Sequence, residues 1–208
     1  MDAEPGLVIF GDVVRSRRDA PATATWLREL ARELDRAYGP DCLAPFGFTQ
    51  GDELQGLLRS TADPLEAILR AALREGDRPM RWVVVLGDVE PGSGPATQRT
   101  GPAFLEARDL LAEAKRRRDR LLVRTGTERV DTLLDDLAPL LAELLDDLST
   151  RQRVIGRLLL VDGLRQADAA ARLDVSRATI SVVAERGRIR PIGRLRRALL
   201  RLLREATA

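Results

Sequence analysis

Acidic side chains at two places in the chain could hold a metal ion. Asp12 ends a short apolar run, and Asp52 and Glu53 follow Gly51 in a segment that reads as a tight turn. Carboxylate oxygens are the hard ligands that Mg²⁺ prefers, and such ions can clamp the phosphates of a nucleotide during in-line displacement. The three residues therefore predict a magnesium site if the fold brings them together. The alternative is purely structural, because Gly-Asp pairs are frequent turn formers.

Arginines and a glycine near these carboxylates could bind phosphate. Arg15 and Arg17 follow Asp12 closely, while Arg99 and Gly101 lie in a Gly/Pro-rich loop that leads into a helix. Guanidinium groups pair with phosphate oxygens, and the free N–H groups at a helix start can hold an anion. We expect the ligand to be a nucleotide or another phosphorylated molecule. The sequence singles out no separate catalytic residue.

The C-terminal part has the order of a helix-turn-helix module. Residues 148–187 predict a helix, a short helix starting near Gln166, a turn and a helix capped by Ser176. Asp174 stands at the turn position where glycine is usual, and aspartate tolerates the left-handed backbone angles needed there. Arg177 suits bidentate contact with guanine in the major groove. The residues expected to contact DNA are Ser176, Arg177, Ala178, Ser181, Arg186 and Arg188.

Charge is distributed unevenly along the chain. Residues 151–208 hold 14 arginines against five acidic residues, a net charge of +9, whereas the remainder holds 20 basic against 27 acidic residues, a net charge of −7. Phosphate neutralisation dominates non-specific affinity for nucleic acids. The asymmetry therefore favours double-stranded DNA as the partner of the C-terminal part. The alternative is a small helical bundle used only for packing or dimerisation.

Hydrophobic periodicity indicates an α+β chain. Apolar runs predict strands at residues 7–14, 81–90 and 120–126 and a hairpin at 46–58, and helical spacing predicts helices at 25–38, 64–74 and 104–118. The order β-α-β-β-α-β of the first six elements fits a ferredoxin-like, palm-like domain. We expect this domain at residues 1–128, an acidic connecting helix at 129–149, and an all-α helix-turn-helix domain at 150–208.

The last segment predicts an amphipathic helix. Leu195, Leu199, Leu202 and Leu203 fall on one face of residues 193–206, and arginines fill the rest. This stripe could form a dimer seam or dock onto the helix-turn-helix module itself. Helix-turn-helix proteins commonly bind paired half-sites, so a homodimer is the expected state.

Composition excludes several classes of protein. The chain contains no histidine, so a Ser-His-Asp or Cys-His nucleophilic site is absent, and Cys42 is the only cysteine, so there is no internal disulfide. No run of 18 apolar residues occurs, and the first residues do not resemble a signal peptide. We expect a cytoplasmic protein that does not bind membranes.

Several motifs resemble the SatD family. They are GDVVRSR at 11–17, FTQGDELQGLLR at 48–59, LGDVE at 86–90 and GPAFLEAR at 101–108, within a resemblance that spans residues 6–125. Members are bacterial proteins, some of which carry a C-terminal helix-turn-helix. The C-terminal module is itself similar to region 4 of sigma factors and to response-regulator modules.

The acidic positions are also similar to those of nucleotidyl-cyclase and GGDEF-type palm domains. This resemblance implies Asp12, Asp52 and Glu53 as metal ligands. The hairpin reads TQGDEL and lacks a double glycine before the acidic residues, and no second Asp follows Asp12 closely. A palm domain that binds a ligand without catalysing a reaction is therefore the alternative.

Three functions follow from these patterns. The first is a transcription regulator whose palm-like domain senses a nucleotide or other phosphorylated ligand and whose basic module binds DNA. The second is a Mg²⁺-dependent nucleotidyl transferase or cyclase that uses Asp12, Asp52 and Glu53. The third is a pair of protein-interaction modules.

Overall fold

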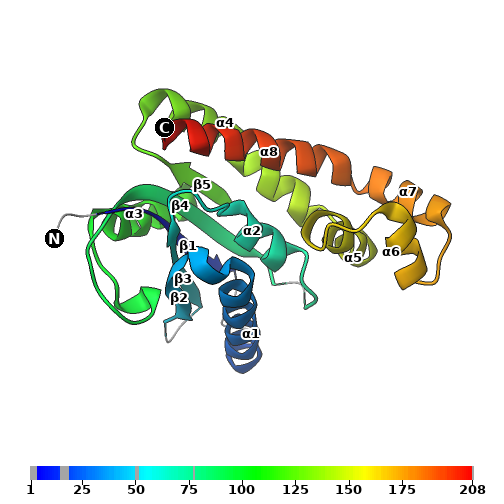
Figure 1. Ribbon diagram of the computed structural model, residues 1–208, viewed down its shortest axis with the longest axis horizontal. Coiled ribbons are helices and arrows are strands. Elements are labelled where there is room, and N and C mark those ends of the chain that lie inside the picture. The colour runs from blue at the N-terminus through cyan, green and yellow to red at the C-terminus, as the bar shows by residue number, and fades with distance from the viewer. Residues whose placement is uncertain (1–3, 15–18, 50–51, 77, 208) are drawn as a thin grey trace.

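The computed structural model describes residues 4–14, 19–49, 52–76 and 78–207. It is a mixed α+β structure with one five-stranded sheet (Figure 1). The strands are β1 (Glu4–Val13), β2 (Cys42–Phe48), β3 (Glu53–Arg59), β4 (Met80–Val89) and β5 (Leu121–Arg124). The helices are α1 (Ala20–Tyr38), α2 (Leu65–Ala72), α3 (Pro102–Arg117), α4 (Glu128–Asp146), α5 (Thr150–Gly156), α6 (Gln166–Arg172), α7 (Arg177–Arg186) and α8 (Ile189–Ala206). Shorter segments are η2 (Gly39–Asp41), η3 (Ala96–Gln98) and a π-helical turn, η4 (Arg157–Val161).

The sheet places β1 at its centre. Its strand order is β2-β3-β1-β4-β5, with antiparallel pairs throughout except for the parallel pair β4 and β5. Leu7, Val8, Ile9 and Phe10 of β1 are all buried, because helices cover both faces of the sheet. The first six elements follow in the order β-α-β-β-α-β, as the sequence predicts.

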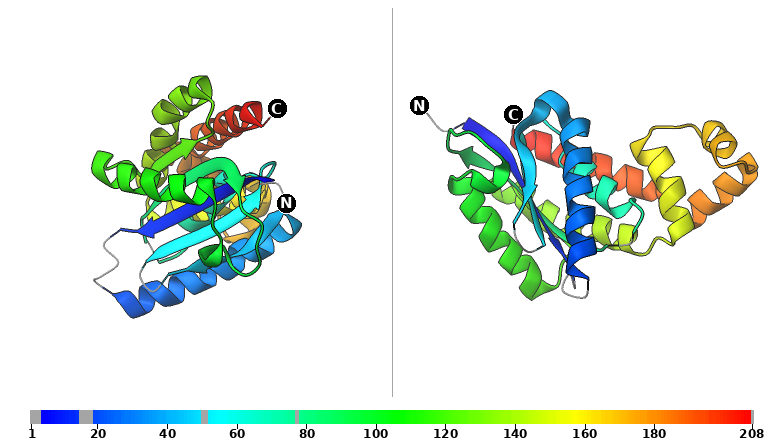
Figure 2. Two further views of the ribbon diagram at one scale, coloured as in Figure 1. Left: turned by 90° about the vertical axis from the view of Figure 1, so that its left-hand side faces the viewer. Right: turned by 90° about the horizontal axis from the view of Figure 1, so that it is seen from below.

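Two hydrophobic layers hold the sheet. One face packs against α1, α2 and α4 through residues such as Leu27, Leu30 and Leu134. The opposite face packs against α3, where Phe10 and Phe104 lie with their ring centroids 6.0 Å apart. Figure 2 shows α1 and α3 on opposite sides of the sheet. The loop before α3 joins this second layer, because Ala96 is fully buried.

The C-terminal helices extend from the sheet along α4. Helix α8 lies beside α4, while α5, α6 and α7 project beyond the sheet (Figures 1 and 2). Leu199 and Leu203 are buried, and Leu195 and Leu202 are half-buried, so the leucine stripe docks within its own chain. The stripe therefore docks mainly on the connecting helix α4 and not, as the docking alternative expected, on the helix-turn-helix module. One continuous hydrophobic core joins the expected N-terminal and C-terminal parts.

Ion pairs also connect the two parts. Glu33 on α1 binds three arginines: Arg70 at 3.2 Å, Arg157 of η4 at 2.5 Å, and Arg74. Arg196 on α8 binds Asp63 at 2.7 Å. These long-range contacts supplement the apolar core, since each guanidinium group supplies several directed donors.

Candidate functional site

Asp12 and Glu53 occupy facing positions on neighbouring strands. Asp12 of β1 pairs in register with Glu53 of β3 on one side and with Arg81 of β4 on the other. The amide of Val13 also donates to the carbonyl oxygen of Asp52 at 3.0 Å. The fold therefore brings together the two acidic segments that the sequence predicts to converge.

Two basic side chains hold the Asp12 carboxylate. Lys115 Nζ, at the end of α3, donates to Asp12 Oδ1 at 2.9 Å, and Arg81 Nη1 lies 3.6 Å from Asp12 Oδ2. The Asp12 side chain is only 11% exposed, whereas that of Lys115 is 47% exposed. Burial lowers the pKa of Arg81, and attraction by Asp12 partly offsets this. Asp12 thus serves as the counter-ion of a partly desolvated arginine.

Glu53 also has a protein partner. Its Oε1 accepts a hydrogen bond from Gln55 Nε2 at 2.6 Å, and Gln55 is a buried polar residue. Gln55 lies two positions further along β3, on the same face of the sheet as Glu53. This contact orients the carboxylate from within its own strand.

These contacts bear on the expected magnesium site. Within the described ranges, no three histidine, cysteine or acidic side chains form a group that could hold a metal ion. The positive charge beside Asp12 comes instead from Lys115, the only lysine in the chain, and from Arg81. A cation binding Asp12 would have to compete with both. The arrangement does not fit a resident Mg²⁺, and the magnesium site stays a prediction.

The expected phosphate-binding residues do not gather at this point. Gly101 precedes α3 beside Val89, and the Arg99 side chain donates to the carbonyl oxygen of Glu90 at 3.2 Å. Asp12, by contrast, pairs with Arg81 of β4. Arg81 and Val89 are eight residues apart on this strand, which corresponds to about 26 Å of extended backbone. Arg99 and Gly101 therefore lie near the opposite end of the sheet from Asp12. Arg15 and Arg17 lie outside the described residues, as does Gly51.

A second candidate surface lies on α7. Ser176 accepts a hydrogen bond from the amide of Thr179 at 3.0 Å and caps the helix, as expected. Asp174 adopts a φ of +51°, so it takes the left-handed turn conformation predicted for it. Ile180 is fully buried, which fixes the rotation of α7 about its axis. The residues of this region that remain exposed are Ser176, Arg177, Ala178, Ser181, Val182, Glu185 and Arg186.

Arg188 differs from the other expected DNA contacts. It lies between α7 and α8 with a φ of +52°, and its guanidinium group is 3.8 Å from Asp147 of the turn after α4. Its side chain is 61% exposed, so this ion pair is solvent-accessible and contributes little to stability. Arg188 can therefore leave Asp147 at small cost.

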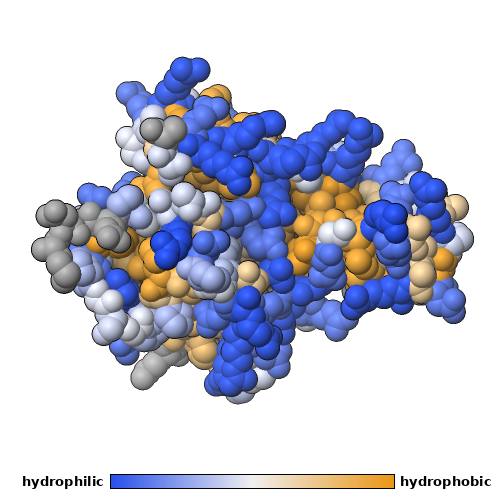
Figure 3. Space-filling model, in the orientation of Figure 1, coloured by the Kyte–Doolittle hydropathy of each residue, from blue (hydrophilic) through white to orange (hydrophobic). Residues whose placement is uncertain are grey.

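A cleft of about 600 Å³ borders α7. Leu159 and Leu160 of η4 supply part of its apolar lining, and Ser181, Arg190 and Arg197 are among its polar residues. Figure 3 shows hydrophobic surface in this part of the molecule, bordered by hydrophilic surface along α8. The cleft connects the exposed face of α7 with the basic face of α8.

Comparisons with known proteins give distant similarities only. No protein-family model and no curated protein matches the chain. A bacterial light-regulated adenylyl cyclase is 14% identical with a TM-score of 0.42, and the match covers 59% of this chain and 44% of the cyclase chain. The chain thus spans less than half the length of that cyclase. A regulator of polyketide synthase expression from Bifidobacterium adolescentis is 14% identical with a TM-score of 0.30, covering 97% of this chain and 82% of the regulator chain.

These similarities are too distant to assign an activity, and the SatD resemblance stays a prediction. Among the helices of the described residues, none is long and apolar enough to cross a membrane.

The residues that sequence reasoning missed are the partners of the carboxylates. Lys115 lies 103 positions from Asp12 in the chain. Gln55 closely follows Asp52 and Glu53, but the sequence predicts a role as metal ligands only for those two acidic residues. One signal was available for Lys115, because it is the only lysine in an arginine-rich chain. A compact ammonium group with a flexible stem differs chemically from a planar guanidinium group.

Proposed function

We propose that the chain is a DNA-binding regulator in which α6, the turn at Asp174 and α7 form a helix-turn-helix. In this proposal α7 lies in the major groove and presents Arg177, Ala178 and Ser181 to base edges. The supporting observation is the orientation of α7: Ile180 and Ala184 face the core, while these three residues are exposed. The net charge of +9 over residues 151–208 supplies the attraction to phosphate.

The geometry of the turn supports the same proposal. The amide of Val175 donates to the carbonyl oxygen of Ala170 at 3.0 Å, which closes the turn directly after α6. Ala169 and Ala170 are buried, and small side chains there let α6 approach its neighbours closely. Leu173, Val175 and Val183 pack against the same core. The turn and the shared core thus hold α6 and α7 against one another, as the proposed helix-turn-helix requires.

Arg177→Ala tests this function. The full chain would first be used to select bound duplexes from a random-sequence pool, and the enriched duplex would then be compared with an unselected duplex by fluorescence anisotropy. Loss of one bidentate base contact costs about 1–3 kcal/mol, so we expect the preference for the enriched duplex to fall by about 5- to 150-fold. Arg36→Ala, an exposed arginine at the end of α1, is the control. Unchanged preference in Arg177→Ala, or equal losses in both variants, would contradict the assignment of α7.

The N-terminal domain would act as the sensor of this regulator. A nucleotide or other phosphorylated ligand remains the proposed signal. Arg99 and Gly101 lie near the opposite end of the sheet from Asp12, so these three residues do not form one phosphate-binding site.

The second candidate function is a Mg²⁺-dependent nucleotidyl transferase or cyclase. The facing positions of Asp12 and Glu53 favour it, and the ion pairs of Asp12 with Lys115 and Arg81 oppose it. Because the described side chains do not fit a resident metal ion, they define no metal-dependent reaction step.

Removing both basic partners of Asp12 separates these two functions. If Lys115 and Arg81 exclude cations, Mg²⁺ leaves the melting temperature of the wild-type protein unchanged and raises that of a variant that combines Lys115→Met with Arg81→Met, because a ligand that binds the native state must stabilise it. Thermal unfolding with and without Mg²⁺ measures this. Arg116→Met, the exposed neighbour on α3, serves as the control. A Mg²⁺-dependent rise in the wild-type protein that disappears in Asp12→Asn would instead support the metal site and the enzyme.

A further inference from the structure

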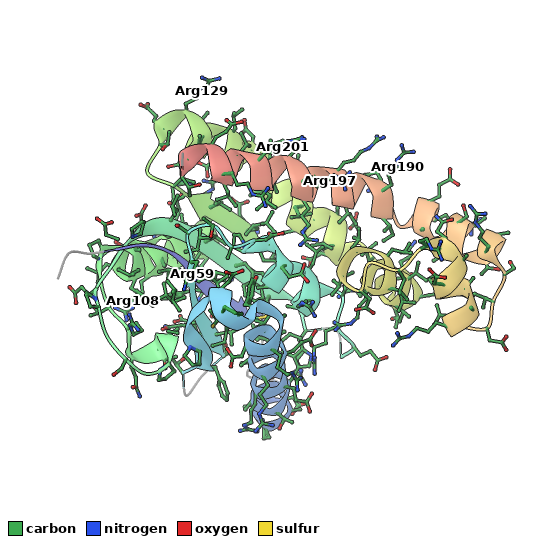
Figure 4. The ribbon with its side chains drawn as sticks, viewed as in Figure 1. Arg59, Arg108, Arg129, Arg190, Arg197 and Arg201 are labelled. Carbon is green, nitrogen blue, oxygen red and sulfur yellow. The ribbon has the colours of Figure 1, made fainter. Side chains whose placement is uncertain are left out.

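Helix α8 carries a row of exposed arginines that its own fold does not explain. The row consists of Arg190, Arg194, Arg197, Arg201 and Arg204, at alternating spacings of four and three residues. This spacing places all five on one helical face, over about 21 Å of helix. Figure 4 shows Arg190, Arg197 and Arg201 along one edge of the molecule, with Arg129 of α4 on the same edge.

The part of the chain that the structure describes does not neutralise the charges of this row. Within residues 4–14, 19–49, 52–76 and 78–207, no ion pair involves any of the five arginines. Arg196, on the other face of the same helix, binds Asp63 and Glu66. Helix α4 beside it exposes Asp136 and Glu143, yet neither forms an ion pair with the row. The row is therefore available to an external anion.

The row also costs helix stability. Like charges at i,i+4 destabilise a helix by about 0.2–0.5 kcal/mol per pair. Arg190 lies in the first turn, where the helix dipole disfavours a cation, and no acidic residue is present there to compensate. The burial of Leu199 and Leu203 against α4 keeps the helix in place. Burial of that apolar face also leaves only the cationic face for a partner, which makes insertion into a lipid surface unfavourable.

The position of the row points to one partner. Arg190 and Arg197 line the same cleft as Ser181 of α7, so the row begins at the helix proposed to enter the major groove. We propose that the α8 row binds the phosphate backbone of the duplex that α7 contacts, on the flank of the recognised site. This inference rests on the proposed function. Phosphate contacts fix orientation and affinity and do not read sequence, so the row would strengthen binding to every duplex.

The test combines Arg194→Gln, Arg197→Gln and Arg201→Gln in the full chain. Each phosphate contact contributes about 0.9 to the slope of log K against log salt, so we expect the slope to become shallower by about 2.7 for both an enriched and an unselected duplex. The preference between the two duplexes should not change. Arg32→Gln, Arg36→Gln and Arg108→Gln together form the control, because they remove three exposed arginines from α1 and α3. The melting temperature of the α8 variant should stay equal or rise, since repulsion is removed.

Other outcomes separate this inference from the proposed function. If the wild-type protein binds no duplex, the proposed function fails. If the wild-type protein binds duplex and the α8 variant keeps the wild-type salt slope, only the inference about α8 is overturned. It is also overturned if the α8 substitutions weaken binding to poly-glutamate and leave duplex binding intact, because the row would then serve an acidic protein partner. Equal slope changes in the α8 and control variants would contradict a specific role of α8.

Discussion

Glu33→Ala should lower the free energy of unfolding by about 3 kcal/mol and the melting temperature by about 6–12 °C. Glu33 is 12% exposed and accepts from Arg70, Arg74 and Arg157, which come from α2, the segment after it, and η4. Its removal leaves three neighbouring guanidinium groups partly buried without their shared counter-ion. Repulsion among them should weaken the docking of η4 on α1. Thermal and urea unfolding of the full chain measure the effect.

Glu29→Ala is the matched control for this substitution. Glu29 lies one turn earlier on α1, is 55% exposed and, among the described residues, forms an ion pair with Arg74 only. An exposed pair contributes less than about 1 kcal/mol, so this variant should stay close to the wild type. Equal losses in the two variants would show that the cluster around Glu33 has no special role.

The pH dependence of the same contact has a definite sign. Burial raises the pKa of Glu33, but hydrogen bonding and attraction by Arg157, with smaller effects from Arg70 and Arg74, outweigh it and leave the pKa below its ordinary value of 4.5. The unfolded state therefore binds the proton more readily. The stabilisation is present above pH 4.5 and is lost as the pH falls through the folded-state pKa. The difference in stability between the wild type and Glu33→Gln should shrink on acidification, and a constant difference would contradict this account.

Gly101→Ala should destabilise the protein by more than about 3 kcal/mol. Gly101 has φ +132° and ψ 171°, a conformation that is essentially restricted to glycine. A Cβ there would lie 2.7 Å from the backbone nitrogen of Glu90 and 3.0 Å from the Cα of Val89. Neither atom can move freely, because Val89 ends β4 and the Glu90 amide donates to the Thr100 carbonyl oxygen. The start of α3 would have to shift away from the sheet.

Gly126→Ala separates backbone strain from collision. Gly126 also has a positive φ, of +76°, but a Cβ there would meet no atom within 4 Å. Only the strain remains, so we expect a loss of about 1 kcal/mol. Urea unfolding of both variants gives the comparison. If Gly101→Ala were no more harmful than Gly126→Ala, the close approach of the loop to β4 would not matter for stability.

Much of the fold could be predicted because it depends on local patterns. The apolar run around Ile9, the helical spacing of Leu27 and Leu30, and the cap at Ser176 each specify one element. The turn pattern predicts a left-handed conformation for Asp174, which the residue adopts. Errors occur at the ends of the elements: the sequence predicts the last helix at residues 193–206, whereas α8 begins at Ile189, before Pro191.

The candidate site was harder to predict because its contacts span long distances in the sequence. Strand pairing brings Asp12 beside Glu53, as expected. Whether the N-terminal or the C-terminal end of α3 lies near Asp12 depends on the direction in which α3 crosses the sheet. Its C-terminal end does, through Lys115, and its N-terminal glycine lies far away. Glu33 presents a similar difficulty, because nothing in the pattern of α1 distinguishes it from exposed acids such as Glu29. Only the packing of α2 and η4 against α1 gives Glu33 its partners.

Site-directed photocrosslinking from α7 to duplex DNA tests the central claim most directly. Burial, followed by the charge of Asp35, raises the pKa of the Cys42 thiol to about 11, so near neutral pH a new exposed thiol can be labelled selectively. A photoreactive group would be attached to Ser181→Cys on α7 and, as the control, to Arg32→Cys on α1, both exposed positions. The account predicts crosslinks to the bases of an enriched duplex from Ser181→Cys and none from Arg32→Cys. Efficient crosslinking from α1, or none from α7 under conditions where the chain binds the duplex, would contradict it.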